Sequence, residues 1–221
     1  MKNVMLLTGA GQIGMAIARR MGCGMKIVMG DKKLENAQAV AKTMNDAGFD
    51  VTAVETDISS RASIQALIAE GQKHGPITML VNAAGVSPSQ APTETLLNLD
   101  MLQPGMVRDT LHAYQLAKRC NEKRVMAEAV KWGARGARLN DIAPGIIVTP
   151  LAIDEFNGPR GDFYKNMFAK CPAGRPGTAD EVANVAELLM GPAGAFISGS
   201  TILIDGGATA SYFYGPLKPQ A

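Results

Sequence analysis

A chain of 221 residues, of which 47% are apolar, is long enough to fold as one domain with a sizeable hydrophobic core. Its 22 basic and 20 acidic residues are interspersed and leave a net charge of +2, without the basic blocks or the basic and aromatic stripes typical of nucleic-acid binding. The composition therefore argues against nucleic acid as a partner.

The cysteines and histidines give no sign of a metal site. Cys23, Cys120 and Cys171 are far apart and form no CxxC pair, and His74 and His112 have no companions at metal-ligand spacing. This usage indicates a reducing, cytoplasmic compartment. The apolar N-terminal run is broken by glycines well short of a signal sequence or a membrane span, so we expect no membrane association.

Short apolar runs alternate with segments of helical period, which predicts an α/β fold: a Rossmann-type, doubly wound parallel sheet with helices on both faces. We expect one domain over residues 1–221. The expected strands are Val4–Leu7, Lys26–Met29, Val51–Glu55, Thr78–Val81, Ala137–Ile142 and Thr201–Ile204. The expected helices are Ile13–Met21, Leu34–Ala47, Ala62–Gly71, Val107–Trp132 and Ala179–Met190, and residues 144–177 are expected to be irregular.

The stretch between Gly85 and Tyr114 is too short for a further strand and its crossover. Such a unit needs about 30 residues or more. Only 28 residues (86 to 113) separate the two positions, and most of their second half belongs to the long helix. A sheet of six or seven strands would therefore lack a central strand here.

The first motif is LLTGAGQIGMAIA at residues 6–18, which carries G-x-G-x-x-G directly after a strand and at the start of a helix. Gly9 permits a tight turn, Gly11 lets the backbone approach a pyrophosphate, and Gly14 lets the helix pack on the strand. The N–H groups at the helix start, at Gln12 and Ile13, can meet the negative charge of the phosphates. The alternative is a glycine-rich turn that binds nothing.

Asp31 ends the second strand 17 positions after Gly14, near the offset at which a carboxylate binds the adenosine ribose. This favours NAD over NADP, because a 2′-phosphate would meet a like charge. Lys32 and Lys33 follow immediately and could instead neutralise that phosphate, or they could belong to a solvated helix start.

Two further strand ends supply candidate contacts to the dinucleotide. Asp57 and Ile58 are expected to border the adenine, with a helix cap as the alternative role of Asp57. Asn82 is either a ligand contact or an amide that ties neighbouring strands together. Room for a ligand beside the sheet is left by the small residues that follow it, Ala83, Ala84 and Gly85.

Residues 111–120, LHAYQLAKRC, place Tyr114 and Lys118 on one face of a helix. A nearby ammonium and the positive charge of an oxidised nicotinamide would both favour the phenolate of the tyrosine. Such a tyrosine can take the proton of an alcohol while hydride leaves for the cofactor, or return it in reduction. On its own the spacing is also compatible with a solvated pair.

The segment NDIAPGIIVTP at residues 140–150 is expected to continue the site. Pro144 and Gly145 turn the chain, and backbone groups near Ile147 and the hydroxyl of Thr149 can meet the nicotinamide carboxamide. The alternative is a proline turn that only ends a strand. Residues 151–173 mix aromatic and charged side chains, which predicts either a lid over the substrate or a surface helix with an apolar face.

In combination these motifs resemble those of the short-chain dehydrogenase/reductase family, in the same order and over nearly the whole chain. The resemblance rests on TGAGQIG at 8–14, Asp31, Asp57, NAAG at 82–85, YQLAK at 114–118, NDIAPGIIVTP at 140–150, GRPGTADEVANVAELLM at 174–190 and ISGSTILIDGG at 197–207. It implies an oxidoreductase that uses NAD or NADP on a small-molecule alcohol or ketone. It also implies that Tyr114 is the acid/base, that Lys118 binds the nicotinamide ribose, and that the protein is a homodimer or homotetramer. Separately, we expect Tyr212, Phe213 and Tyr214 at a subunit contact, because an aromatic cluster on the surface of a monomer is unusual.

The chain departs from the family pattern in two places. Its glycine loop is one residue shorter than the usual T-G-x-x-x-G-x-G. The segment that carries a catalytic serine and an asparagine in relatives is missing, and Met101 and Leu102 stand about a dozen residues before Tyr114, where the serine would be. Either the printed sequence omits a segment near Ala91 and Pro92 or the protein has lost one. We favour the first, because losing a central strand would expose two strand edges.

Two other classes of function remain compatible with parts of the sequence. A dinucleotide-binding sensor or scaffold without catalysis would explain the absent serine. A methyltransferase shares the glycine loop and the acidic residue after the second strand, but it has no use for YQLAK or for NDIAPGIIVTP.

Overall fold

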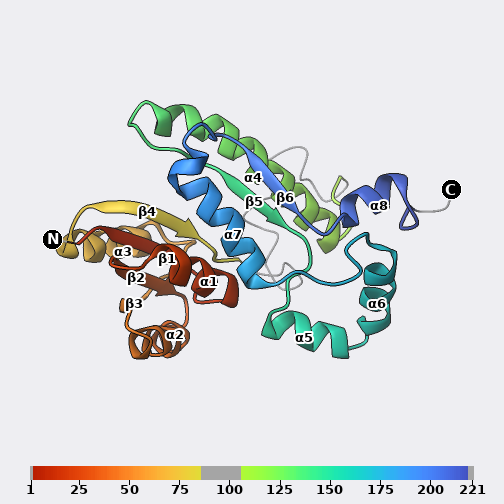
Figure 1. Ribbon diagram of the computed structural model, residues 1–221, viewed down its shortest axis with the longest axis horizontal. Helices are drawn as coiled ribbons and strands as arrows, with labels where there is room; N and C mark the ends of the chain where they lie inside the picture. Colours follow the sequence, from red (N-terminus) through yellow and green to blue (C-terminus); the bar gives the residue numbers. More distant parts are fainter. Residues whose placement is uncertain (1, 86–105, 219–221) are drawn as a thin grey trace. The chain divides into compact units, whose positions relative to one another are not determined.

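The computed structural model describes residues 2–85 and 106–218 (Figure 1). The chain forms two compact units. The first unit consists of Met1–Ala84, Ile142–Ala193 and Leu203–Ala221, and the second of Gly85–Asp141 and Gly194–Ile202.

The strands and helices of the described residues alternate along most of the chain. The strands are β1 Val4–Thr8, β2 Lys26–Asp31, β3 Asp50–Glu55, β4 Ile77–Asn82, β5 Asp141–Pro144 and β6 Thr201–Ile204. The helices are α1 Gln12–Met21, α2 Leu34–Asp46, α3 Arg61–His74, α4 Thr110–Gly133, α5 Pro150–Asn157, α6 Gly161–Lys170, α7 Ala179–Met190, the 3-10 helix η4 Pro192–Gly194 and α8 Ala208–Tyr214.

The first unit contains a four-stranded sheet in the order β3-β2-β1-β4. All of its pairings are parallel, with Val4 of β1 opposite Lys26 of β2 on one side and Ile77 of β4 on the other. A helix connects each strand to the next, as parallel pairing requires. The predicted α/β fold with a Rossmann-type parallel sheet is therefore confirmed.

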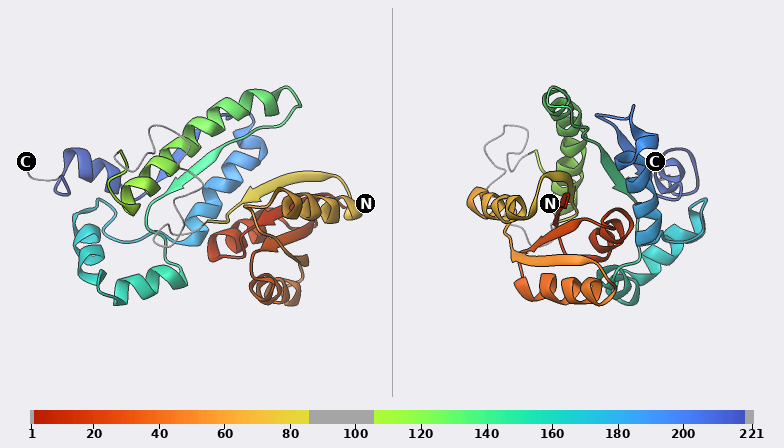
Figure 2. Two further views of the ribbon diagram at one scale, coloured as in Figure 1. Left: turned by 180° about the vertical axis from the view of Figure 1, so that it is seen from behind. Right: turned by 60° about the vertical axis from the view of Figure 1, so that its left-hand side comes forward.

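Helices cover both faces of the sheet (Figure 2). The side chains of β1 therefore alternate between two apolar layers, one on each face. Met5 and Leu7 are completely buried in a cluster with residues of α1, α2 and α7. Val4 and Leu6 point the other way and pack with Leu67 of α3. Because both faces are covered, β1 reads as a continuous apolar run, which is typical of a parallel strand.

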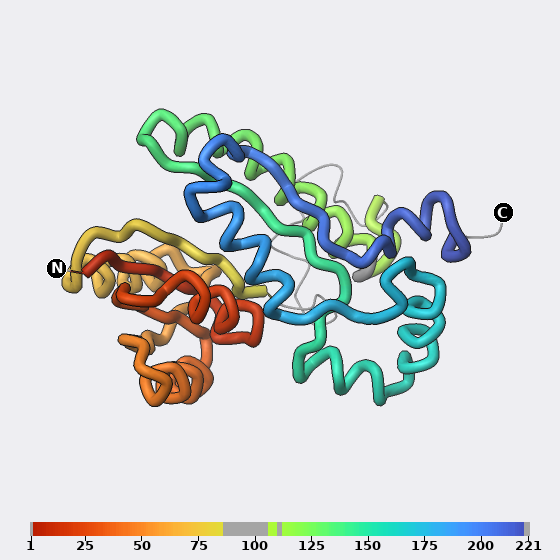
Figure 3. The backbone as a smooth tube through the Cα atoms, in the orientation of Figure 1, coloured from red at the N-terminus to blue at the C-terminus, as the bar shows by residue number. Residues whose placement is uncertain are grey.

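Helices α1 and α7 are far apart in the sequence but lie side by side in the first unit (Figure 3). The buried Ala183 and Ala186 of α7 join the same apolar cluster as Ile17 of α1. An ion pair of 3.0 Å links Arg20 to Glu187 across the two helices. Helix α7 therefore packs against α1, the helix that follows the glycine loop.

Strand β4 has an open edge in the part of the chain that the structure describes. There it pairs with β1 alone, and β5 pairs with β6 in a separate two-stranded sheet. Leu80 of β4 remains 49% exposed. Residues 86–105, where the strand was predicted to be lacking, lie outside the described residues.

The second unit is built on α4 and the loop before β6. Asp109 caps α4 by accepting a hydrogen bond of 2.7 Å from the backbone N–H of His112. Asn140 donates to the carbonyl of Ile197 at 2.8 Å and accepts from the N–H of Ser200 at 3.2 Å. The side chain of Asn140 thus joins two chain segments, a role that its position in the sequence did not reveal.

Two local predictions were wrong, and one helix was not predicted. The strand expected at Ala137–Ile142 is formed by Asp141–Pro144, because the chain before it is held by the side-chain bonds of Asn140 and the strand ladder starts at Asp141. Residues 144–177 are not irregular, since they contain α5 and α6. Helix α8 was missed, because Gly206 and Gly207, both with positive φ, read as the end of a strand rather than the start of a helix.

The long helix predicted at Val107–Trp132 is α4, Thr110–Gly133, and it buries little of its surface. Ala129 is buried, whereas Trp132 and Lys118 are exposed within the chain. The apolar positions of α4 follow a helical period, but most of them remain on the surface of this chain.

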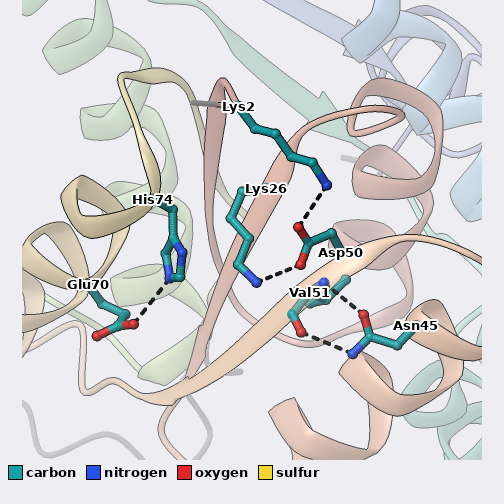
Figure 4. Close-up of polar contacts among 7 residues, drawn as sticks. All are labelled: Lys2, Lys26, Asn45, Asp50, Val51, Glu70 and His74. Carbon is teal, nitrogen blue, oxygen red and sulfur yellow. Dashed lines mark hydrogen bonds and ion pairs between the residues drawn. The ribbon is translucent and has the colours of Figure 1, made fainter.

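At the amino ends of the strands, Lys2 and Lys26 converge on the carboxylate of Asp50 (Figure 4). Lys26 reaches Oδ1 at 2.7 Å and Lys2 reaches Oδ2 at 2.9 Å. These two ammonium groups, Lys26 first, hold the pKa of Asp50 below its usual value. The Lys26 side chain is only 12% exposed, so Asp50 compensates a largely buried positive charge.

We expect Asp50→Ala to lower the free energy of unfolding by about 1–3 kcal/mol, because it leaves the buried ammonium of Lys26 without its partner. Urea unfolding at pH 7 measures this. The matched control is Asp46→Ala, whose partner Lys42 is exposed, and it should change stability by about 0.5 kcal/mol or less. Equal effects of the two variants would contradict the assignment.

The Asp50 contribution also predicts a pH dependence. The folded protein lowers the pKa of this carboxyl from its ordinary value of 3.8. The stabilisation is therefore complete above that value and is lost as the pH falls toward the lowered pKa. The stability difference between the parent and Asp50→Ala should shrink across that acidic window.

Candidate functional site

The glycine loop lies directly against the end of β4. Gly9 has a φ of +90°, and a Cβ atom there would stand 2.6 Å from the backbone N of Ala84. Gly14 is equally restricted, since its Cβ would stand 2.6 Å from the carbonyl oxygen of Gly9. Both glycines are therefore required by close backbone approach, as the motif predicted.

Gly11 differs from these two glycines because open space lies beside it. A Cβ atom at this position would meet no atom within 4 Å. Gly11 is also the N-cap of α1, and no side chain caps the helix. The start of α1 at Gln12 and Ile13 thus combines room for a ligand with the positive end of a helix, a combination that fits a pyrophosphate.

Asp31 lies beside this loop and is bonded to it. Its Oδ2 atom accepts a hydrogen bond of 2.9 Å from the N–H of Ala10, and its Oδ1 atom accepts one of 3.0 Å from the N–H of Lys33. A carboxylate has further lone pairs, so it can also accept a ribose hydroxyl. The bond to Ala10 was not foreseen, although an acidic residue at the end of the neighbouring strand was the available signal.

Asp57 follows β3 at the same edge of the sheet, one strand further from β1. Its Oδ1 atom accepts hydrogen bonds from the N–H and the hydroxyl of Ser59, at 2.9 and 2.6 Å, and its Oδ2 atom lies 3.0 Å from Nζ of Lys32. Asp57 does not cap α3, since the N-cap is Ser60. The neighbouring Ile58 is exposed, which suits an adenine contact.

The amide of Asn82 ties β4 to β1. Its Oδ1 atom accepts a hydrogen bond of 2.6 Å from the hydroxyl of Thr8. The N–H of Ala83 continues the connection by donating to the carbonyl of Thr8 at 2.9 Å. The structural role considered for Asn82 is therefore confirmed, and its NH₂ group has the chemistry to serve a ligand as well.

The turn after β5 is held against the end of β6. Pro144 is the last residue of β5, and a Cβ atom on Gly145 would stand 2.7 Å from Cα of Asp205. Ile147 is buried and bridges to Gly177. A cavity of about 270 Å³ lies beside this turn and is lined in part by Ile146, Ile147, Arg175 and Asp205.

Thr149 is the N-cap of α5, with Pro150 as the first helical residue. Its hydroxyl oxygen accepts a hydrogen bond of 3.2 Å from the N–H of Ala152. The O–H group can still donate, because a hydroxyl both accepts and donates. The cap therefore leaves the predicted contact to a carboxamide oxygen chemically possible.

Tyr114 and Lys118 lie one turn apart on α4, in the second unit. The ammonium of Lys118 lies 5.4 Å from the centre of the Tyr114 ring. Both side chains are exposed within the chain. The structure thus brings the two side chains together, as their spacing predicted.

The predicted site residues belong to both units. The second unit holds Tyr114, Lys118 and Gly85, and the first unit holds the remaining ones. No group of three His, Cys, Asp or Glu side chains in the described residues is arranged to hold a metal ion. Within the same residues, no helix is both long enough and apolar enough to cross a membrane.

Models of known protein families match this chain over residues 3–209. Residues 3–103 match the family described as short chain dehydrogenase, and residues 91–209 match the one described as enoyl-(acyl carrier protein) reductase. The chain belongs to the short-chain dehydrogenase/reductase family. Family membership implies NAD or NADP as the cofactor.

Two curated members of the short-chain dehydrogenase/reductase family are similar over most of the chain. A protein of Alternaria brassicicola named short-chain dehydrogenase/reductase bsc3 is 28% identical, with 95% of this chain and 96% of the relative covered. D-threitol dehydrogenase of Mycolicibacterium smegmatis is 32% identical, with 94% and 93% covered. Both are relatives in sequence, and their substrates do not transfer directly.

The fold of the short-chain dehydrogenase/reductase family is also found in solved structures. A crystal structure of actinorhodin polyketide ketoreductase with NADPH matches with a TM-score of 0.77 at 23% identity, covering 94% of this chain and 97% of that one. The similarity confirms the Rossmann-like fold.

The alignments also bear on the missing segment. The one with the Alternaria brassicicola protein extends over 264 residues, although this chain has 221. That short-chain dehydrogenase/reductase therefore contains residues that have no counterpart here. This agrees with the prediction that the chain lacks a segment of the family; the location expected for it, near Ala91 and Pro92, lies outside the described residues, as do Met101 and Leu102.

We expect Gly11→Ala to weaken dinucleotide binding and Gly14→Ala to lower stability. At position 11 the added methyl group enters open space with an ordinary φ, so stability is kept but dinucleotide affinity falls by about tenfold or more. At position 14 the methyl group meets the backbone of Gly9, so the free energy of unfolding falls by about 1–3 kcal/mol.

Calorimetric titration with NADH and thermal unfolding of both variants measure these effects. Tight NADH binding by Gly11→Ala would contradict the assignment of the glycine loop as the pyrophosphate site.

Proposed function

We propose that the protein is an NAD(H)-dependent oxidoreductase that interconverts a secondary alcohol and a ketone by hydride transfer. The observation that carries this proposal is the pairing of Tyr114 with the Lys118 ammonium, 5.4 Å from its ring centre, in a short-chain dehydrogenase/reductase. Relatives named as dehydrogenases of threitol and galactitol support an alcohol as the substrate.

In this proposal Tyr114 is the general acid/base. When an alcohol is oxidised, its carbon loses hydride and its hydroxyl proton passes to the Oη atom of Tyr114; in reduction the proton returns by the same route. A bound nicotinamide would supply the hydride acceptor or donor. Lys118 would bind the nicotinamide ribose, and proton transfer of this kind contributes about 10² to 10⁴ in rate.

The proposed cofactor site uses the edge of the sheet described above. The N–H groups at the start of α1 would bind the pyrophosphate beside Gly11, where open space is present. Asp31 would accept the ribose hydroxyls, and its negative charge favours NAD over NADP. The remaining contacts are assigned to Gly9, Gln12, Ile13, Gly14, Asp57, Ile58, Asn82, Ala83, Ala84, Gly85, Lys118, Pro144, Gly145, Ile147 and Thr149.

We assign the role of a substrate lid to residues 151–173. Helices α5 and α6 in this segment are joined by a hydrogen bond of 2.6 Å from the Tyr164 hydroxyl to Glu155. The ring of Phe156 packs edge-on against Tyr164 and Phe168, with ring centres 5.3 and 5.4 Å apart. Burial and the neighbouring Glu155 raise the pKa of Tyr164, so this tyrosine is a hydrogen-bond donor rather than a second base.

A dinucleotide-binding protein without catalysis is the second candidate. It is favoured by the open edge of β4 among the described residues and by the lack of a serine at Met101 and Leu102. The intact mass of the purified protein separates the two. A mass near 23.2 kDa would favour the second candidate, and a mass several kilodaltons higher would favour the dehydrogenase.

A cytoplasmic location and a homodimer or homotetramer remain predictions.

We expect Tyr114→Phe to lower kcat by about 10² or more while NADH affinity stays within about twofold of the parent, because only the proton donor is removed. Turnover is measured with a panel of polyols and cyclic ketones, and affinity by fluorescence titration.

The matched control for Tyr114→Phe is Tyr212→Phe, which removes a hydroxyl from the exposed α8. It should keep the parent rate. Parent-like turnover of Tyr114→Phe would exclude Tyr114 as the acid/base.

A further inference from the structure

The ends of β2 and β3 carry an ion pair at the edge of the proposed adenosine site. The two strands are paired in register, with Asp31 opposite Glu55. Lys32 follows the first of these residues and Asp57 stands two positions after the second. The Nζ atom of Lys32 lies 3.0 Å from Oδ2 of Asp57, so the two strand ends are connected by opposite charges.

Asp57 is the fixed member of the pair. Its other oxygen accepts the two hydrogen bonds from Ser59, and its own N–H donates to the hydroxyl of Ser63 at 2.9 Å. The hydrogen bonds from Ser59, followed by Lys32, lower the pKa of Asp57 to about 2. The carboxylate is therefore ionised and held in place at neutral pH.

Lys32 is the more exposed member of the pair. Its side chain is 75% exposed, compared with 35% for Asp57, so its long stem can reach another anion if the pair breaks. Next to it, Asp31 is already bonded to the N–H groups of Ala10 and Lys33. A 2′-phosphate near Asp31 would need a cation to offset that carboxylate, and Lys32 is one of the two lysines that adjoin it in the sequence.

We propose that Asp57 is a specificity-determining residue that holds Lys32 in an ion pair and so withdraws this ammonium from the 2′-phosphate of NADP. The inference rests on the proposed NAD(H)-dependent function and extends it. Discrimination between the two dinucleotides depends on this pair as well as on the charge of Asp31. Asp57 acts here through Lys32, as a positioning residue.

The exposure of the pair sets the size of the effect. An exposed ion pair changes an equilibrium by about fivefold or less, because water screens the charges and the lysine loses conformational freedom. Breaking the pair should therefore shift the ratio of the NADPH and NADH dissociation constants by about three- to tenfold, since Asp57 also ceases to repel the phosphate.

The test is a double-mutant cycle on the purified full chain, read out as dissociation constants for NADH and NADPH from calorimetric titration. We expect Asp57→Asn, which can still accept the Ser59 bonds, to lower the NADPH-to-NADH ratio of dissociation constants by about three- to tenfold. In the Lys32→Ala background the same substitution should change the ratio by about twofold or less. Lys32→Ala alone should leave it within about twofold of the parent.

The outcomes distinguish this inference from the function on which it rests. An equal shift with and without Lys32 would mean simple repulsion by Asp57 and would overturn the role of the pair. The Lys33→Ala background serves as the matched control: if the gain disappeared there and persisted without Lys32, the assignment to Lys32 would be wrong. NADH binding with an unchanged ratio in Asp57→Asn overturns the inference alone. Failure of the parent to bind either dinucleotide overturns both.

Discussion

The pairing of β1 between β2 and β4 is the constraint on which the first unit depends. The glycine loop leaves β1 at its carboxyl end and is held from both sides: Gly9 lies against the backbone of Ala84 after β4, and the N–H of Ala10 donates to Asp31 at the end of β2. Both contacts exist only while the three strands are in register. The fold and the proposed pyrophosphate site are therefore products of the same pairing.

Ion pairs lie at both ends of the strands of this sheet, and the burial of the charged groups decides what each pair does. At the amino ends of the strands, Asp50 neutralises the largely buried Lys26, so removal of the Asp50 carboxylate should lower the stability of the fold. At the carboxyl ends of the strands, Lys32 and Asp57 form an ion pair that is open to solvent and that adds little to stability. An exposed pair can be exchanged for a ligand contact, which makes it suitable for discriminating between dinucleotides.

Most of the proposed cofactor contacts lie outside the segment in which the family carries its catalytic serine. The glycine loop, Asp31 and Asn82 are bonded to one another through backbone and strand contacts within the first unit. The serine expected from the family would belong to the segment after β4, and in the described residues β4 has one neighbouring strand.

The sequence by itself determined the class of fold, most strand and helix positions and the clustering of small and acidic residues at strand ends, because apolar period and glycine spacing are local signals. It misplaced β5, missed α8, and gave a surface helix only as an alternative to a lid for the segment that forms α5 and α6. The start of β5 depends on a contact between distant residues, Asn140 with Ile197, and the packing of α5 on α6 depends on the side-chain contact of Phe156 with Tyr164.

The partners of the site residues were likewise decided only in three dimensions. The bond between Asp31 and Ala10, the tie between Asn82 and Thr8 and the pair of Lys32 with Asp57 each join residues from different strand ends. The sequence specified which charges and amides are present, because residue type is local information. Tertiary structure decided which of them meet, because strand order brings distant ends of the chain to one edge.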